Sequence, residues 1–216
     1  MSMKSKENLT HQAIGGSVLL GISSTVQRIG SLVFTMVLAR VLLPDGFGIY
    51  SLAISISFLF AIFSREGIDT AFMRYLSEAV KSKNKNKENA CFRYVFKLKI
   101  FLALTVSTTI LILAYPLSIY VFRKPFLFMP LLLSAGYIFV FSLEGLFTSF
   151  FFAMKKVKYV VYKETIFQSI RLLLTILLFS FILSNPNASE TIIIMIAALL
   201  ATLIFVVYKT YKVSPH

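Results

Sequence analysis

The sequence predicts an all-α, polytopic membrane protein. Of its 216 residues, 57% are hydrophobic and only 14% are charged, whereas about 25% of the residues in a soluble domain are usually charged. The mean hydropathy is +0.82. The apolar residues gather into six segments that are long enough to cross a bilayer as helices, for which about 20 residues are needed. These expected spans cover residues 14–38, 48–64, 96–121, 126–152, 165–183 and 191–208.

The connections between the spans are short or strongly polar. Residues 1–13 are expected to form a cytoplasmic lead-in, and residues 209–216 a cytoplasmic tail. Proline and glycine predict tight outer turns at residues 43–48, 123–125 and 184–187. The second span is the shortest, and we expect its helix to continue past Ser64. Residues 67–80 are expected to be helical, residues 81–89 to form a mobile loop, and residues 155–163 a basic inner loop.

The net charge of +13 is distributed as a membrane topology predicts. With the N-terminus inside, seventeen lysines and arginines lie on the inner side: Lys4 and Lys6, nine between residues 65 and 99, four between residues 155 and 163, and Lys209 and Lys212. Only Arg40, Arg123 and Lys124 lie outside. The positive-inside rule therefore predicts that both termini are cytoplasmic. No nucleic-acid partner is needed to explain the basic composition.

The first span carries a polar stripe with an arginine at its centre. Its six members lie within about 80° of one another on a helix, and they are Ser17, Gly21, Ser24, Arg28, Ser31 and Thr35. A charge at membrane depth costs at least about 2.5–3.5 kcal/mol, so it normally faces a bundle interior or a wet cavity. The stripe predicts a pathway or binding site for a polar, anionic ligand. A purely structural bond from Arg28 to Glu144 or to backbone carbonyls is the alternative.

The fourth and fifth spans carry further charges. Arg171 shares one helical face with Glu164, Gln168 and Thr175, and Glu144 shares one with Thr148. Counted from the expected ends of the spans, Glu144 and Arg171 both lie roughly 10–15 Å from the inner boundary at 1.5 Å per residue. We therefore expect them to pair. Such a pair either locks two helices together or belongs to a site.

Several chemistries are disfavoured by the residues present. The two histidines, His11 and His216, lie outside the spans, which argues against an intramembrane Ser–His protease and a histidine metal site. No span carries two closely spaced acidic residues, as a metal-dependent lipid transferase would need. There is no P-loop. We expect a protein that is not an enzyme and that uses no metal or other cofactor.

Three stretches resemble polysaccharide flippases. "ARVLLPDGFGIYSLAISI" at residues 39–56 is similar to their junction between the first and second spans, with Leu43-Pro44 where Gly-Pro is common. "GIDTAFMRYLSEA" at residues 67–79 and "KKVKYVVYKETIFQSIRLLLTILL" at residues 155–178 resemble the segments after their second span and before their fifth. The resemblance covers roughly residues 10–208. Such flippases share a superfamily with multidrug extruders and have twelve to fourteen spans, so the chain resembles their N-terminal lobe alone.

The resemblance implies a six-helix lobe, one of two that enclose a cationic cavity in the cell membrane. The cavity would pass a lipid-linked oligosaccharide, of the polyprenyl pyrophosphate type, from the cytoplasmic to the outer leaflet. Arginines suit this role because a guanidinium binds phosphate in two-point contacts and stays charged when buried. The implied substrate-binding residues are Arg28, Arg40, Arg65, Arg74 and Arg171, with Ser24 and Ser31 beside Arg28 on its stripe. Glu144 and Asp69 are candidates for an ion pair or for ion coupling.

Three other interpretations are compatible with the sequence. An organic-cation extruder of the same superfamily would be expected to have an acidic cavity, whereas the polar face here is cationic. A six-span substrate-binding subunit of a multi-component importer fits the length. The chain could also be an inactive, truncated remnant. A single lobe cannot enclose a two-sided cavity, so transport would need a second lobe or a homodimer.

Overall fold

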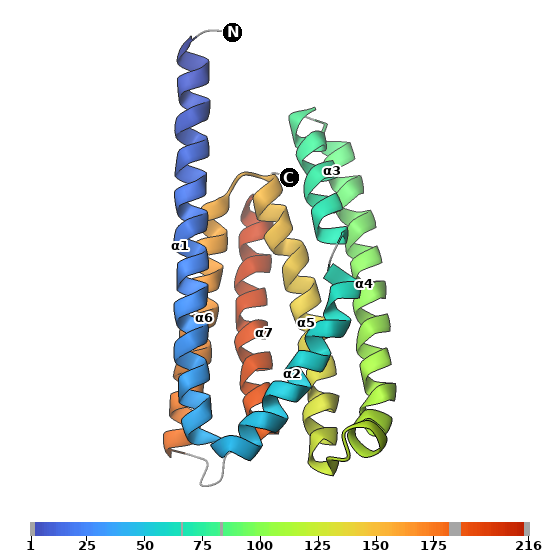
Figure 1. Cartoon of the computed structure of the whole chain (residues 1–216). Coiled ribbons are helices and arrows are strands. Elements are labelled where there is room, and N and C mark those ends of the chain that lie inside the picture. Colours follow the sequence, from blue (N-terminus) through green and yellow to red (C-terminus); the bar gives the residue numbers. More distant parts are fainter. Residues whose placement is uncertain (1–2, 66, 83, 182–186, 214–216) are drawn as a thin grey trace.

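The computed structural model is a bundle of long helices (Figure 1). It describes residues 3–65, 67–82, 84–181 and 187–213, and within these ranges it contains helices and no strand. The all-α prediction is confirmed. The helices are α1 (Met3–Val41), α2 (Leu43–Arg65), α3 (Ile68–Lys81), α4 (Lys85–Pro116), α5 (Phe128–Ala153), α6 (Val157–Phe181) and α7 (Ala188–Val213), with a π turn at Leu117–Val121 and a 3₁₀ turn at Pro125–Leu127.

Five helical segments of the described chain are long and apolar enough to cross a membrane: Val18–Val41, Leu43–Lys81, Lys85–Val121, Pro125–Ala153 and Ala188–Lys212. The expected span at residues 165–183 lies on α6 as far as Phe181, and its last two residues are outside the described ones. The protein is therefore a multi-pass membrane protein. The expected turn at 184–187 and the tail at 209–216 also lie partly outside the described residues.

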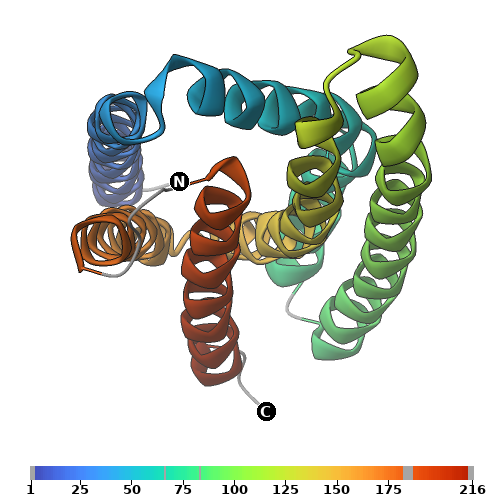
Figure 2. The same ribbon diagram turned by 90° about the horizontal axis from the view of Figure 1, so that it is seen from below.

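The helices surround α5. This helix packs against α4, α7, α2 and α3, while α1 packs mainly against α6. The view along the bundle shows α1 and α6 side by side at one edge and α4 at the opposite edge (Figure 2). The helix α1 begins, and α7 ends, toward the same end of the bundle (Figure 1).

The expected turn at residues 43–48 is wrong, because these residues form the first turns of α2. Proline is tolerated in the first turn of a helix, since its missing N–H would have no partner there. Asp45 adds a carboxylate at the same end, where the helix dipole favours negative charge. At the other end α2 passes Ser64 by one residue only. Gly67 has a φ of 80°, a conformation that glycine adopts at little cost, and it separates α2 from α3.

Two expected loops are also largely helical. Of the described residues in the range 81–89, only Ser82 and Asn84 lie outside the helices. The Asn84 side chain accepts a hydrogen bond of 3.2 Å from the backbone N–H of Lys87 and so caps α4. Likewise α6 begins at Val157, so most of the expected inner loop at residues 155–163 is helix. Lys163 is consequently inside the bundle, 8% exposed.

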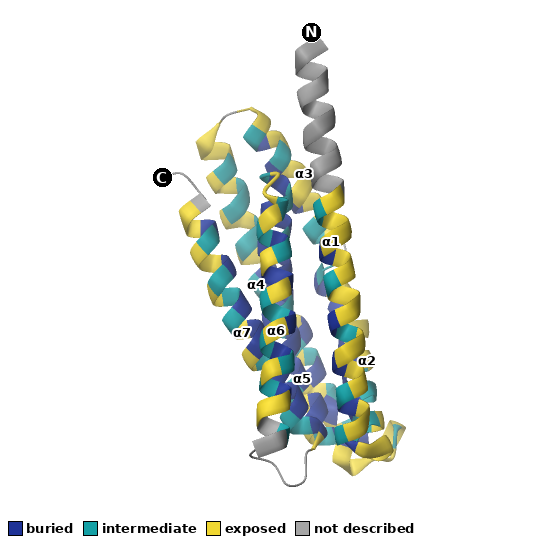
Figure 3. Ribbon diagram, turned by 90° about the vertical axis from the view of Figure 1, so that its left-hand side faces the viewer, coloured by how far each residue is buried: buried dark blue, intermediate teal, exposed yellow. Residues whose placement is uncertain are grey.

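The core consists of two apolar parts. One includes Phe34, Leu131 and Ile192, and the other, nearer the chain termini, includes Phe72 and Phe151. Buried side chains line the inner faces of the helices, and much of α1 is exposed on its outer side (Figure 3). Buried polar residues lie between the two apolar parts on four helices. They are Ser64 on α2, Lys99 on α4, Ser142 and Glu144 on α5, and Thr202 on α7.

Candidate functional site: a buried charge layer

The residues between the two apolar cores form a layer of alternating charges, which we call the charge layer. It consists of Arg65, Asp69, Lys99, Glu144, Lys163, Glu164, Gln168 and Arg171. These residues come from α2, α3, α4, α5 and α6. Charges buried in a bundle are costly unless they are paired and hydrogen-bonded. The layer therefore holds five helices in a defined register.

One part of the layer is centred on Asp69 at the start of α3. The fully buried ammonium of Lys99 lies 2.5 Å from Asp69 Oδ1 and donates a 2.8 Å hydrogen bond to the Ser64 carbonyl. Asp69 Oδ2 lies 3.5 Å from Arg65 Nε, one helical turn earlier in the sequence. The Arg65 guanidinium is also 4.0 Å from the centre of the Phe141 ring, a cation–π geometry. Asp69 thus joins α2, α3 and α4 across the break at Gly67.

The second part is centred on Glu144. This carboxylate forms an ion pair with Lys163 and accepts a 3.0 Å hydrogen bond from the Thr148 hydroxyl. Lys163 also lies 3.5 Å from Glu164, so its ammonium is shared between two carboxylates. Both Glu144 and Lys163 are less than 10% exposed, and this pair links α5 to α6.

The layer ends at Arg171, which faces α1. Glu164 accepts a hydrogen bond from the Gln168 amide (3.1 Å), and Gln168 Oε1 accepts one from Arg171 Nη2 (2.5 Å). The same guanidinium reaches Ser31 Oγ at 3.4 Å and lies 4.0 Å from the centre of the Phe34 ring. Arg171 forms no ion pair with a described carboxylate, and its buried Nε has no hydrogen-bond partner among the described residues. Counted together, the layer holds four cations and three carboxylates, so the surplus positive charge is at Arg171.

A groove of about 390 Å³ opens beside the first part of the layer. Arg65 and Asp69 form one wall, and Phe141, Gly145 and Thr148 of α5 form the other. A Cβ added to Gly145 would lie 2.8 Å from Asp69 Oδ2 and 2.9 Å from Arg65. Glycine at this position therefore allows α5 to approach the ion pair closely.

The structure groups some of the candidate residues predicted from the sequence. It brings Arg65, Asp69 and Glu144 into the charge layer, and it joins Arg171 to Ser31. The expected pairing of Glu144 with Arg171 is wrong, because Glu144 pairs with Lys163. That expectation placed the inner end of the fifth span near residue 165, whereas α6 begins at Val157. Measured from the inner ends of their helices, Glu144 lies nine residues deep and Lys163 six, whereas Arg171 lies fourteen residues deep.

The remaining candidates lie outside the layer. Arg28 and Ser24 are exposed on α1. The Ser24 hydroxyl donates a 2.9 Å hydrogen bond to the Gly21 carbonyl, and Arg28 has no hydrogen bond or ion pair with another described residue. Arg40 is exposed in the last turn of α1, and Arg74 is exposed on α3. A role for these residues in substrate binding stays a prediction.

Sequence reasoning missed two members of the layer. From their charge, Lys99 and Lys163 are expected on the cytoplasmic side, but both are buried. For Lys99 a signal was available, since it lies three residues inside the apolar segment that begins at residue 96. A lysine there needs a partner, and Asp69 is an acidic residue on the neighbouring expected helix.

Comparisons with known proteins agree with this architecture. The model of a family described as "Polysaccharide biosynthesis protein" matches residues 14–215. Two solved structures superpose with TM-scores of 0.78 at 13% identity: an outward-facing multidrug resistance transporter of the MATE family in the MOP superfamily, and a MOP superfamily transporter from Pyrococcus furiosus. Each covers 91% of this chain, which in turn spans only 44% of each of those chains. No curated protein matches the sequence. The chain thus belongs to the polysaccharide biosynthesis protein family and has the fold of about half of a MOP superfamily transporter.

Proposed function

We propose that the chain acts as the N-terminal lobe of a transporter that moves a lipid-linked oligosaccharide precursor across the cell membrane. The observation that carries this proposal is the presence of two arginines, Arg28 and Arg171, that lie within the expected spans and lack an ion pair with any described carboxylate. Uncompensated guanidinium groups at membrane depth are expensive. A substrate with a pyrophosphate group would neutralise the exposed Arg28 by charge-assisted, two-point hydrogen bonds, and the buried Arg171 would attract it through its charge.

The two arginines would serve this substrate differently. Arg28 lies on the exposed side of α1, so it would line a cavity between this lobe and a second one. Arg171 lies behind α1, next to Ser31, and would add positive potential to the same wall. The polyprenyl tail would stay in the bilayer while the pyrophosphate and sugars cross the cavity. The second lobe is a further part of the same protein, a second copy, or a separate partner.

Export of organic cations is the alternative that one comparison favours, because one of the similar structures is a multidrug resistance transporter. The charges in this lobe disfavour it. An exporter of cations needs an excess of carboxylates in its cavity, whereas the α1 stripe that would line the cavity has Arg28 as its charged residue. The buried charge layer behind α1 has four cations and three carboxylates, so it also adds positive potential. The two functions differ in the charge of the ligand that should bind best: negative for the lipid-linked oligosaccharide and positive for an exported organic cation.

Ligand binding to the purified chain in nanodiscs tests the proposal. A polyprenyl pyrophosphate, the uncharged polyprenol and tetraphenylphosphonium would be titrated against the protein, with the shift of the thermal unfolding midpoint as the measure of binding. We expect the pyrophosphate lipid to bind best, and Arg28→Gln to weaken it by about 10–100-fold, as for the loss of a hydrogen bond to a charged group. Arg93→Gln, which removes an exposed arginine on α4, is the matched control. Preferential binding of the phosphonium cation would contradict the proposal.

A further inference from the structure

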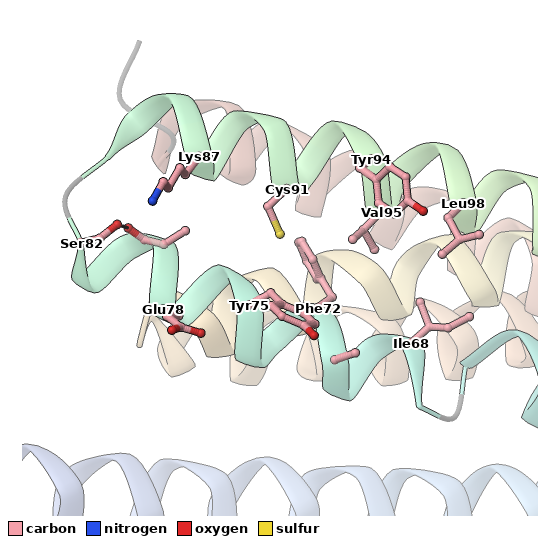
Figure 4. Close-up of a pocket in the computed structure, with 12 residues that line it drawn as sticks. Ile68, Phe72, Tyr75, Glu78, Ser82, Lys87, Cys91, Tyr94, Val95 and Leu98 are labelled. Carbon is pink, nitrogen blue, oxygen red and sulfur yellow. Dashed lines mark hydrogen bonds between the residues drawn. The ribbon is translucent and has the colours of Figure 1, made fainter.

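A second groove, separate from the charge layer, runs between α3 and α4 (Figure 4). Its volume is about 570 Å³, and its lining comes only from α3, the capping residue Ser82 and α4. The interior is apolar and includes Phe72, Val95 and Leu98. Figure 4 shows the Cys91 sulfur pointing from α4 into the space between the two helices, with most of the bundle behind them and α1 below. The groove is therefore open on the outer surface of the hairpin.

The groove has the length of one bilayer leaflet. Its lining extends along α3 from Ile68 to Ser82, which at 1.5 Å per residue corresponds to about 21 Å. A bilayer including its headgroup regions is about 40–45 Å thick, so one leaflet measures about 20–22 Å. The polar lining residues Ser82 and Lys87 are at the end near the connection between α3 and α4, and the apolar pair Ile68 and Leu98 is at the other (Figure 4). The lining thus changes from polar to apolar along the groove, in the same order as a leaflet changes from headgroups to acyl chains.

The polar end of the groove is also cationic. Lys87 lines it, and its side chain forms no ion pair with a described carboxylate. Lys81 and Lys85 are exposed near the same end, which also has two carboxylates, Glu78 and Glu88. With Lys87, the described cations outnumber the described carboxylates by one. Clusters of basic residues on the cytoplasmic side of a membrane protein attract anionic lipid headgroups.

Two tyrosines stand at the open side of the groove. Tyr75 and Tyr94 line it and are 64% and 71% exposed. Tyrosine is enriched at the level of the headgroups because its ring is apolar and its hydroxyl is polar. Their exposure indicates that the groove faces an interface between apolar and polar surroundings.

We infer that this groove binds an anionic phospholipid of the cytoplasmic leaflet. One acyl chain lies between α3 and α4 against Phe72, Val95 and Leu98, and the phosphodiester contacts Lys87. This inference depends on the fold and the topology of the lobe and is independent of the proposed transport substrate. A bound phospholipid would stabilise the position of α3, and with it the position of Asp69, which belongs to the charge layer.

The chain supplies its own reporter for this site. Cys91 is the only cysteine, it is free and half-exposed, and it lines the groove. The rate at which a small maleimide reacts with Cys91 would be measured for the full chain in nanodiscs of phosphatidylcholine, with and without phosphatidylglycerol. We expect phosphatidylglycerol to slow the reaction by about fivefold or more, the effect of one cation on an anionic headgroup.

Three variants identify the binding determinants. Lys87→Gln should remove the protection, whereas Lys158→Gln, at an exposed lysine of α6, should preserve it. Ala71→Trp fills the groove from an exposed position, so it should leave the fold intact and lower the amount of phosphatidylglycerol that stays bound in native mass spectrometry. Circular dichroism would check that each variant keeps its helix content.

Four results would overturn the inference. The first is an equal reaction rate in both bilayers, and the second is protection that survives Lys87→Gln. The third is protection by a polyprenyl phosphate but not by phosphatidylglycerol, which would assign the groove to the tail of an isoprenoid lipid. The fourth is a Cys91 that reacts in detergent but in neither bilayer, with no phospholipid retained, which would mean that protein covers the groove.

Discussion

The polar stripes of α1 and α6 have similar sequences and opposite surroundings. Each places one arginine among small or polar residues at helical spacing, Arg28 on α1 and Arg171 on α6. Arg171 is 5% exposed, lies over Phe34 and is hydrogen-bonded to Gln168. Arg28 is exposed and has no partner among the described residues. A polar stripe in the sequence therefore locates the polar face of a helix. The packing of the bundle decides whether that face contacts other helices of the lobe or is exposed on its surface.

The largest expected effect comes from breaking the buried ion pair between Lys163 and Glu144. Lys163→Met leaves Glu144 without its partner, and loss of one member of a buried pair costs about 3–5 kcal/mol in the free energy of unfolding. The double variant Glu144→Gln, Lys163→Met should regain part of that loss, because Glu144 is then neutral and Glu164, the second carboxylate beside Lys163, keeps its hydrogen bond from Gln168. Thermal unfolding in detergent would measure both, with Lys158→Gln as the control. Equal stability of Lys163→Met and the native chain would show that the pair is not buried in the membrane protein.

A smaller effect is expected from replacing the two arginines themselves. Arg171→Met loses its hydrogen bonds and its contact with Phe34, at a cost of about 1–3 kcal/mol. Arg28 has no described partner, so Arg28→Met should change the free energy of unfolding by no more than about 0.5 kcal/mol. The same unfolding measurement compares the two variants directly. If Arg28→Met destabilises the isolated lobe as much as Arg171→Met does, Arg28 has a structural partner and the contrast between the stripes disappears.

Substitutions at two glycines of α1 would show which side of this helix packs against α6. A Cβ added to Gly30 would lie 2.8 Å from the Gln168 side chain, whereas one added to Gly21 would meet nothing within 4 Å. Gly30→Ala should therefore destabilise the lobe by about 1–3 kcal/mol through overpacking. Gly21→Ala should stabilise it by about 0.5–1 kcal/mol, because alanine loses less freedom in a helix. The opposite order would mean that α1 is rotated relative to α6.

The sequence was sufficient to predict the fold class and the existence of the long helices. Hydropathy identifies spans well, since the bilayer requires long apolar helices, but it does not locate helix ends. The helices α2, α4, α6 and α7 extend beyond the apolar segments, because polar residues such as Lys85 and Lys158 also form helix. These extensions shifted the estimated depth of the charges and led to the wrong partner for Glu144.

The composition of the charge layer was only partly predictable, for a related reason. Asp69 lies four residues after Arg65, just beyond the break at Gly67, so their proximity follows from their closeness in the sequence. The partners Lys99 and Lys163 come from other helices, 30 and 19 residues from Asp69 and Glu144. Only the packing of α4 and α6 determines that these lysines point inward. A basic residue near the end of an apolar span is ambiguous, because it can face either the headgroups or a buried carboxylate.

Transport by the intact transporter with Arg28 replaced is the most direct test of the central claim, that α1 presents Arg28 to a substrate outside the lobe. Translocation of a polyprenyl-pyrophosphate-linked oligosaccharide would be measured in proteoliposomes containing this lobe and its complement. Arg28→Ala should unfold at the native temperature yet lose about 10–100-fold in transport, and Arg28→Lys should retain part of it because it keeps the charge without the two-point contact. Normal transport by both variants at native stability would show that Arg28 contacts no phosphate and would contradict the claim.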